Sequence, residues 1–277
     1  MLVLASGYVL LCVGLAKLYV SPFRTSIPKL KNFSRVVLKD GEPIWISPGL
    51  QSGRSHARTL YVMSHGLGGG IGHWSPLGDQ LVQKGYDVIL TEMPAHGDSP
   101  DSVCTFGNKE SEIIVEATKW ADARYKKRPR VVLVGVSLGG ASSWLATEKA
   151  PSLFDAIVTE GCFARLNDVS DNWFDRRIPE GHILFWPVKR FAGEMAGVDP
   201  MTINPVEAAA KWKGKPALVI HCQEDDLMKE SYADDLAHAS GAKLWTIPKA
   251  AHSQGCAVAN SEYFKRLLAF AAKPNVH

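Results

Sequence analysis

Clustered charge, a cysteine framework and internal repeats are all missing from this 277-residue sequence. No run of five like charges occurs, and 31 basic against 28 acidic residues leave a net charge of only +3, so no nucleic-acid partner is expected. The five cysteines are scattered and odd in number, which excludes a disulfide scaffold, and no zinc-type spacing is present. Without a fixed-period repeat, a solenoid or propeller is also excluded.

The overall amino-acid composition is that of a folded globular protein. Hydrophobic residues make up 46% of the chain and charged residues 21%, which rules out global disorder. A chain of this length forms one or two domains of about 150 residues, and α/β enzymes often use the whole span as one.

Residues 1–20 form an apolar segment whose one charged side chain is Lys17. About 20 helical residues cover the hydrocarbon thickness of a bilayer, so the segment is predicted to be an N-terminal membrane anchor. Two alternatives stay open. One is a secretory signal peptide, since Gly14 and Ala16 are small residues ahead of a possible cut before Lys17. The other is a helix buried in the protein core.

Basic residues on one side of this segment predict its orientation. The positive-inside bias places the rest of the chain on the cytoplasmic side of the membrane, and the unpaired cysteines agree with a reducing compartment. The sequon that begins at Asn32 favours the opposite side, and a cleaved signal would give a secreted protein. Residues 21–34 are interpreted as a linker. The basic residues are Lys17, Arg24, Lys29, Lys31 and Arg35.

From residue 35 onward, short apolar runs alternate with helical patterns. After a hairpin over residues 35–47, strands are predicted over 59–64, 87–91, 130–134, 155–159, 216–220 and 243–247, and helices over 74–84, 109–126, 138–149 and 257–272. The pattern predicts the α/β class, with a mostly parallel sheet covered by helices on both faces. Ligands bind outside the carboxyl ends of such strands, so residues just after a strand are the first candidates for a site.

A G-x-S-x-G sequence at 135–139 follows one of these strands and opens a helix. This is the context in which a sharp turn presents the serine hydroxyl at the top of the sheet, and Ser137 is therefore the candidate nucleophile. Ser142 and Ser143 lie within the following helix and are poor candidates. The backbone N–H of Leu138, at the start of that helix, would favour an anion that develops on an attacked carbonyl.

A serine nucleophile needs a base and an orienting carboxylate. His252, in the loop after the last strand, is the predicted base, in preference to His73, His96 and His221. The loop after the strand at 216–220 carries three adjacent carboxylates, of which Asp225 is the preferred acid. Asp226, Glu224 and the strand-end Glu160 remain alternatives.

A glycine-rich stretch at 65–70, HGLGGG, follows the strand at 59–64. It could present the N–H of Leu67 opposite that of Leu138, and the two would form an oxyanion hole. The spacing does not fit G-x-G-x-x-G, and no G-x-x-x-x-G-K occurs, so a nucleotide-binding loop is excluded. No metal or organic cofactor is expected.

These motifs resemble the α/β-hydrolase superfamily over most of residues 57–272. PAHGDS at 94–99 and HCQEDDLM at 221–228 look like the serine-aminopeptidase and monoacylglycerol-lipase-like branch, with Ala95, Cys222 and Met228 replacing more usual residues. An apolar N-terminal segment is also similar to Bem46-like membrane-associated hydrolases. The resemblance implies the α/β-hydrolase fold, singles out Asp225 as the acid, and implies that Glu160 belongs to a strand-end pattern without serving as the acid.

More than fifty residues separate the strands at 155–159 and 216–220, and a cap is predicted at about 162–212. Its many aromatic residues can line an apolar pocket or pack the cap on the sheet. The 35–277 catalytic domain is thus expected to be a serine hydrolase of lipid-like carboxylic esters, with a preference for medium or long acyl chains over acetate. The alternatives are an amide or peptide hydrolase and a non-catalytic binding module.

Overall fold

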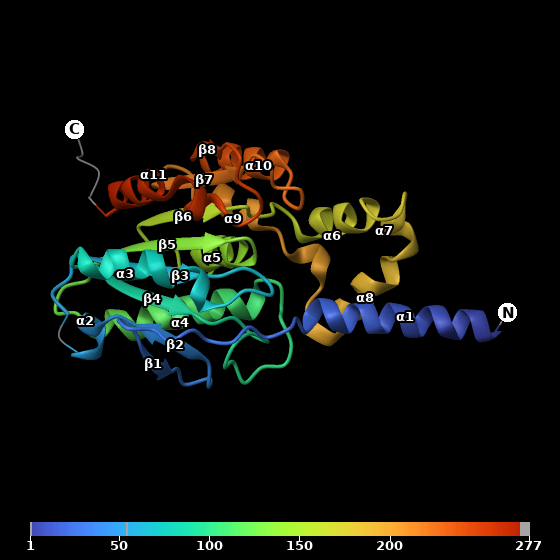
Figure 1. The fold of residues 1–277 in the computed structure, drawn as a ribbon, viewed down its shortest axis with the longest axis horizontal. Coiled ribbons are helices and arrows are strands. Elements are labelled where there is room, and N and C mark those ends of the chain that lie inside the picture. Colours follow the sequence, from blue (N-terminus) through green and yellow to red (C-terminus); the bar gives the residue numbers. More distant parts are fainter. Residues whose placement is uncertain (1, 54, 272–277) are drawn as a thin grey trace.

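An eight-stranded sheet lies at the centre of the structure, a computed structural model that describes residues 2–53 and 55–271 (Figure 1). The strand order is β1-β2-β4-β3-β5-β6-β7-β8. The hairpin β1 and β2 pairs antiparallel with β4 at one edge, and all other neighbours are parallel. The strands are β1 (Ser34–Val37), β2 (Pro43–Ile46), β3 (Thr59–Ser64), β4 (Asp87–Thr91), β5 (Arg130–Val136), β6 (Ala156–Glu160), β7 (Ala217–Cys222) and β8 (Lys243–Ile247).

Helices cover both faces of the sheet because alternate strand residues point to opposite sides. Tyr61 and Met63 pack in the core under α3 and α11, whereas Leu60 and Val62 pack in the core under α4, α5, α9 and α10. Both faces are therefore buried, which explains why the strands appear in the sequence as continuous apolar runs. The helices are α2 (Pro48–Gln51), α3 (Ser75–Gln83), α4 (Asn108–Asp122), α5 (Leu138–Lys149), α9 (Pro205–Lys211), α10 (Glu230–Ser240) and α11 (Gly255–Ala269).

The predicted fold class is confirmed. The strands at 59–64, 87–91 and 243–247 and the helix at 138–149 have the predicted bounds, and the other predicted strands and helices shift by a few residues. The hairpin turns at Gly41, whose φ of 92° is a conformation that glycine adopts without strain. Helix α10 was not among the predicted elements.

The insertion between β6 and β7 begins with three helices that lie beyond the end of the sheet (Figure 1). Aromatic rings join them, since Phe174 stacks on Phe185 with the ring centroids 5.2 Å apart. We call these helices the cap; the boundaries predicted for it from the sequence, 162–212, stay a prediction. The helices are α6 (Leu166–Asp175), α7 (Gly181–Leu184) and α8 (Trp186–Ala196), and the 3-10 turns are η1 (Ile71–His73) and η2 (Pro200–Thr202).

Helix α1 (Leu2–Val20) runs beside α8 and extends away from the sheet (Figure 1). Cys12, Ala16 and Val20 are spaced four apart and therefore share one face of the helix, and all three are buried in the same core cluster as the cap. The hydroxyl of Tyr8 donates a hydrogen bond to the carbonyl of Leu184. One face of the N-terminal helix is thus part of the protein interior.

The prediction of a transmembrane anchor over residues 1–20 is wrong. In the part of the chain that the structure describes, no helix combines the length and the apolar character needed to cross a bilayer. Instead, one face of this helix, with Cys12, Ala16 and Val20, is buried where α1 contacts α8. The predicted membrane location and the cytoplasmic orientation both depended on the anchor, and they are withdrawn with it.

The burial of Ala16 leads to a prediction about stability. Replacing Ala16 by Phe should lower the free energy of unfolding by about 1–3 kcal/mol, because the larger side chain overfills a packed interior. Urea denaturation measures the change. The control is Leu10→Ser on the same helix, where the leucine is 72% exposed and the substitution should alter stability by less than about 0.5 kcal/mol. An Ala16→Phe protein with the same free energy of unfolding as the wild type would contradict the burial of this face of α1.

Candidate active site

Ser137 lies in a strained turn between β5 and α5. Its backbone has φ 53° and ψ −120°, a combination that residues with a side chain rarely adopt. Its N–H is bonded to the carbonyl of Glu160 at 2.8 Å, so the turn is held against the end of β6. This is the geometry expected of the serine in a strand–turn–helix elbow, and it places the hydroxyl outside the carboxyl end of the sheet.

Glycines allow this turn because their neighbours leave no room for a side chain. A Cβ at Gly139 would overlap the carbonyl oxygen of Ser64 on β3, and a Cβ at Gly135 would overlap the backbone of Gly139. At Gly66 a Cβ would lie 3.0 Å from the Cβ of Ser137. The glycines of the G-x-S-x-G sequence and of the glycine-rich stretch therefore serve close backbone packing around Ser137.

His252 and Asp225 meet Ser137 in one hydrogen-bonded chain. Nε2 of His252 lies 3.1 Å from Oγ of Ser137, and Nδ1 lies 2.6 Å from Oδ2 of Asp225. A carboxylate can only accept, so Nδ1 carries the proton and Nε2 accepts the serine proton. The Asp225 side chain is fully buried, and its Oδ1 accepts the N–H groups of Leu227 and Met228 at 3.0 and 2.8 Å.

The alternative acids lie in other surroundings. Asp226 pairs with Arg176 at 2.7 Å, its carboxylate is 78% exposed, and that guanidinium lowers its pKa. Glu224 is exposed. Glu160 is fully buried, and its Oε1 accepts the N–H of Gly255, the first residue of α11, at 2.8 Å. Burial raises the pKa of the Glu160 carboxyl. Among these carboxylates, the one hydrogen bonded to His252 in the described structure is that of Asp225.

The alternative bases are also accounted for by other contacts. His221 is buried within β7. His73 packs edge-on against Trp74 with a centroid distance of 4.5 Å, and burial lowers its pKa to about 4. The ring of His96 is bonded to backbone on both sides, because Nδ1 donates to the carbonyl of Pro94 and Nε2 accepts the N–H of Gly68, both at 2.8 Å.

His96 thereby supports the glycine-rich stretch at 65–70. Gly68 has a φ of 69°, which suits glycine, and its N–H is fixed by the His96 ring. His65 occupies the start of the same stretch, where its Nε2 lies 2.8 Å from the buried carboxylate of Glu92. The structural role of His96 was not predicted from the sequence, although the PAHGDS motif marked its position.

The two predicted oxyanion-hole residues lie on the same side of the site. Leu67 and Leu138 both line the cavity that contains Ser137 and His252. Leu138 is the first residue of α5, and the N–H groups of a first helical turn have no acceptor within the helix. Their role in holding an oxyanion stays a prediction.

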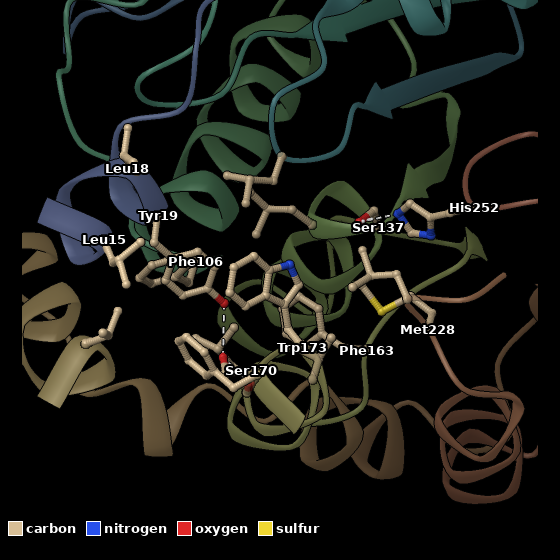
Figure 2. Close-up of a pocket in the computed structure, with 17 residues that line it drawn as sticks. Leu15, Leu18, Tyr19, Phe106, Ser137, Phe163, Ser170, Trp173, Met228 and His252 are labelled. Atoms are coloured by element: carbon tan, nitrogen blue, oxygen red, sulfur yellow. Dashed lines mark hydrogen bonds between the residues drawn. The ribbon is translucent and has the colours of Figure 1, made fainter. Parts of the chain in front are cut away.

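A cavity of about 440 Å³ opens beside Ser137 (Figure 2). The volume lies in the range of small-molecule sites, about 300–1,000 Å³. Apart from Ser137 and His252, its lining is mostly aliphatic and aromatic, and includes Phe106, Phe163 and Trp173. Leu15, Leu18 and Tyr19 of α1 also line it, a contribution that an interpretation of residues 1–20 as an anchor had missed. Within the described residues, no group of three or more His, Cys, Asp or Glu side chains could hold a metal ion.

Comparison with known proteins agrees with this fold. A profile described as the α/β hydrolase fold matches residues 62–200, half of the chain, and the chain therefore belongs to the α/β hydrolase fold family. A search of curated proteins gave no match.

Solved structures show the same architecture. An esterase from Pyrococcus furiosus superposes with a TM-score of 0.70 at 20% identity, covering 91% of this chain and 96% of that one. An enol-lactonase from Burkholderia xenovorans gives 0.60 at 17% identity, with 87% and 100% covered. A metagenome-derived lipolytic enzyme gives 0.59 at 18% identity, with 85% and 99% covered. At these identities, the similarity establishes the shared fold.

The buried His96 leads to a prediction about pH. Burial and the neighbouring His65 lower the pKa of His96 from 6.5 to about 4. Between these values the unfolded chain binds a proton that the native protein does not, so stability should fall as the pH is lowered through this window. When the pH is lowered from 7 to 4.5, the titration of His96 alone should reduce the free energy of unfolding by about 1–3 kcal/mol.

Urea unfolding at the two pH values tests this prediction. His73 titrates in the same direction, so the His96→Asn protein should keep part of the pH dependence and lose the rest. Equal pH dependence in the wild-type and His96→Asn proteins would show that His96 is not buried in its neutral form.

Proposed function

We propose that the protein is a serine hydrolase that cleaves carboxylic esters through Ser137, His252 and Asp225. The observation that supports this most is the continuous hydrogen-bonded chain from Oγ of Ser137 through the His252 ring to the buried Asp225, at the edge of an apolar cavity. A nucleophile, a base and an orienting carboxylate are the three groups that acyl transfer requires.

In the first step, Oγ of Ser137 attacks the acyl carbon while Nε2 of His252 takes its proton. Asp225 keeps the proton of the imidazole on Nδ1 and stabilises the imidazolium that forms. The N–H groups of Leu67 and Leu138 hold the developing oxyanion. His252 then donates its new proton to the leaving alcohol, which leaves an acyl-enzyme at Ser137.

In the second step, water attacks the acyl-enzyme. His252 takes a proton from the water, and the same two N–H groups hold the second oxyanion. Collapse of the intermediate returns the proton to Ser137 and releases the carboxylic acid.

The lining of the cavity supports an ester with a hydrocarbon acyl group as the substrate. A hydrocarbon chain gains about 0.8 kcal/mol for each methylene it buries, whereas a peptide amino terminus would have to leave water for a cavity with few polar groups. We therefore place lipid-like acyl esters ahead of amides and peptides. The motifs at 94–99 and 221–228 support membership of the monoacylglycerol-lipase-like branch. Ester hydrolysis is also the activity for which the Pyrococcus furiosus esterase is named.

Replacing Ser137 by Ala tests the nucleophile. The variant should keep its fold and lose p-nitrophenyl ester hydrolysis by several orders of magnitude, because no acyl-enzyme can form. A fluorophosphonate probe should label the wild-type protein at Ser137 and leave the variant unlabelled. The matched control is Ser143→Ala, whose hydroxyl donates to the carbonyl of Gly139 within α5. Wild-type turnover by Ser137→Ala would refute the mechanism and favour a non-catalytic module.

Replacing Asp225 by Asn tests the acid. The amide cannot stabilise the imidazolium or keep the tautomer, so kcat should fall by about 10³–10⁴-fold. Asp226→Asn, one residue further along the same loop, should stay within about threefold of wild type because its exposed carboxylate contributes little. A larger loss in Asp226→Asn than in Asp225→Asn would reverse the assignment.

A further inference from the structure

The cavity is bounded by the reacting groups on one side and by the N-terminal helix on the other. Figure 2 shows Ser137 and His252 at one side of the view and Leu15, Leu18 and Tyr19 of α1 at the opposite side. A chain bound to Ser137 that follows the cavity therefore runs toward α1.

Hydrogen bonds hold α1 at this position. At its carboxyl end, the carbonyl of Val20 accepts the N–H of Cys104 at 2.7 Å, and the hydroxyl of Ser21 donates to the carbonyl of Ser102 at 2.7 Å. Toward its other end, Tyr8 is bonded to the carbonyl of Leu184 on the cap. Because these bonds attach α1 to the rest of the protein at Tyr8 and at its carboxyl end, the stretch between them, which includes Leu15 and Tyr19, forms a wall of the cavity.

The hydroxyl groups of Tyr19 on α1 and of Ser170 on the neighbouring α6 line this side of the cavity, and the protons of both are already used. The Oγ of Ser170 donates its single proton to the carbonyl of Leu166 at 2.8 Å. The hydroxyl oxygen of Tyr19 lies 3.0 Å from the same Oγ, and the Tyr19 hydroxyl must therefore be the donor of the hydrogen bond between them. Burial raises the pKa of Tyr19 to about 12, so its hydroxyl is neutral at physiological pH. Among the described residues that line the α1 side of the cavity, none therefore offers a ligand a free hydroxyl proton or a charge.

We propose that α1 determines acyl specificity: the acyl chain of the ester extends from Ser137 across the cavity and ends as a methyl-terminated hydrocarbon against Leu15 and Tyr19. This inference rests on the proposed function, since it requires an acyl group on Ser137. Each methylene buried on the way should raise kcat/KM about fourfold, and the gain should stop once the chain reaches α1.

A bulky residue on the wall should shorten the preferred chain. Leu15 is half-buried and lines the cavity, so Leu15→Trp should fill its end. Over p-nitrophenyl esters from acetate to laurate, kcat/KM for the ester that the wild type prefers should fall at least about tenfold, and the optimum should move to a shorter chain. The value of kcat/KM for the acetate ester should fall by less than that for the preferred ester, because acetate does not reach α1.

Two further variants control for damage to the fold. Leu10→Trp introduces the same side chain elsewhere on α1, at a leucine that is 72% exposed and does not line the cavity. The chain-length profile of this variant should match that of the wild type. Leu15→Ala enlarges the cavity instead, so the optimum should move to a longer chain. A general loss of stability would lower kcat/KM by the same factor for every ester. It could not move the optimal chain length in opposite directions in the two Leu15 variants.

The nature of the chain end is tested by two esters of equal length. The octanoate ester ends in a methyl group, and the mono-p-nitrophenyl ester of suberic acid ends in a carboxylate. The carboxylate would have to be desolvated beside a wall that offers no free proton, so its kcat/KM should be at least about 100-fold lower.

The outcomes separate this inference from the proposed function. If Ser137→Ala abolishes hydrolysis but Leu15→Trp, Leu15→Ala and wild type share one chain-length profile, α1 does not set specificity while the serine mechanism stands. Equal turnover of the octanoate and suberate esters would likewise overturn the proposed chain end. If Ser137→Ala retains wild-type turnover, the serine mechanism fails, and the α1 proposal fails with it.

Discussion

The structure depends on the strained backbone of Ser137, where β5 passes into α5. A positive φ at a serine persists only when the surrounding structure holds it. Here the backbone packs so closely that a side chain at position 135 or 139 would have no room, and both positions are glycine. The same close packing brings the end of β3 against α5 and places Gly66 beside the serine. The glycine-rich stretch and the turn at Ser137 are therefore held against each other by this close backbone packing.

Two buried carboxylates organise the other half of the site in different ways. The carboxylate of Asp225 accepts hydrogen bonds from the His252 ring and from two backbone N–H groups, and so orients the ring toward Ser137. Glu160 accepts the N–H of Gly255 and the thiol of Cys222, and so attaches the start of α11 to the ends of β6 and β7. The loop that carries His252 lies between these two attachments. One carboxylate therefore contacts the His252 ring, and the other positions the backbone that follows it.

The central parallel strands could be predicted from sequence because both of their faces are buried, which produces short apolar runs such as those at 87–91 and 130–134. Helix α10 escaped prediction, since Leu236 is surrounded in sequence by acidic and small residues and its burial depends on the sheet beneath it. Residues 1–20 were misassigned for a related reason. Cys12 and Ala16 indicate an apolar setting without specifying whether lipid or protein supplies it.

What the sequence determined by itself is the order of the chemistry along the chain: Ser137, Asp225 and His252 each follow a strand, and parallel strands end at one edge of the sheet. Only the tertiary structure decided which of the adjacent carboxylates faces His252, because Asp225 and Asp226 differ by one step of a loop whose direction local sequence does not specify. The tertiary structure also decided that α1 borders the cavity. Burial of an apolar helix against the cap is a long-range contact, and no local pattern records its partner.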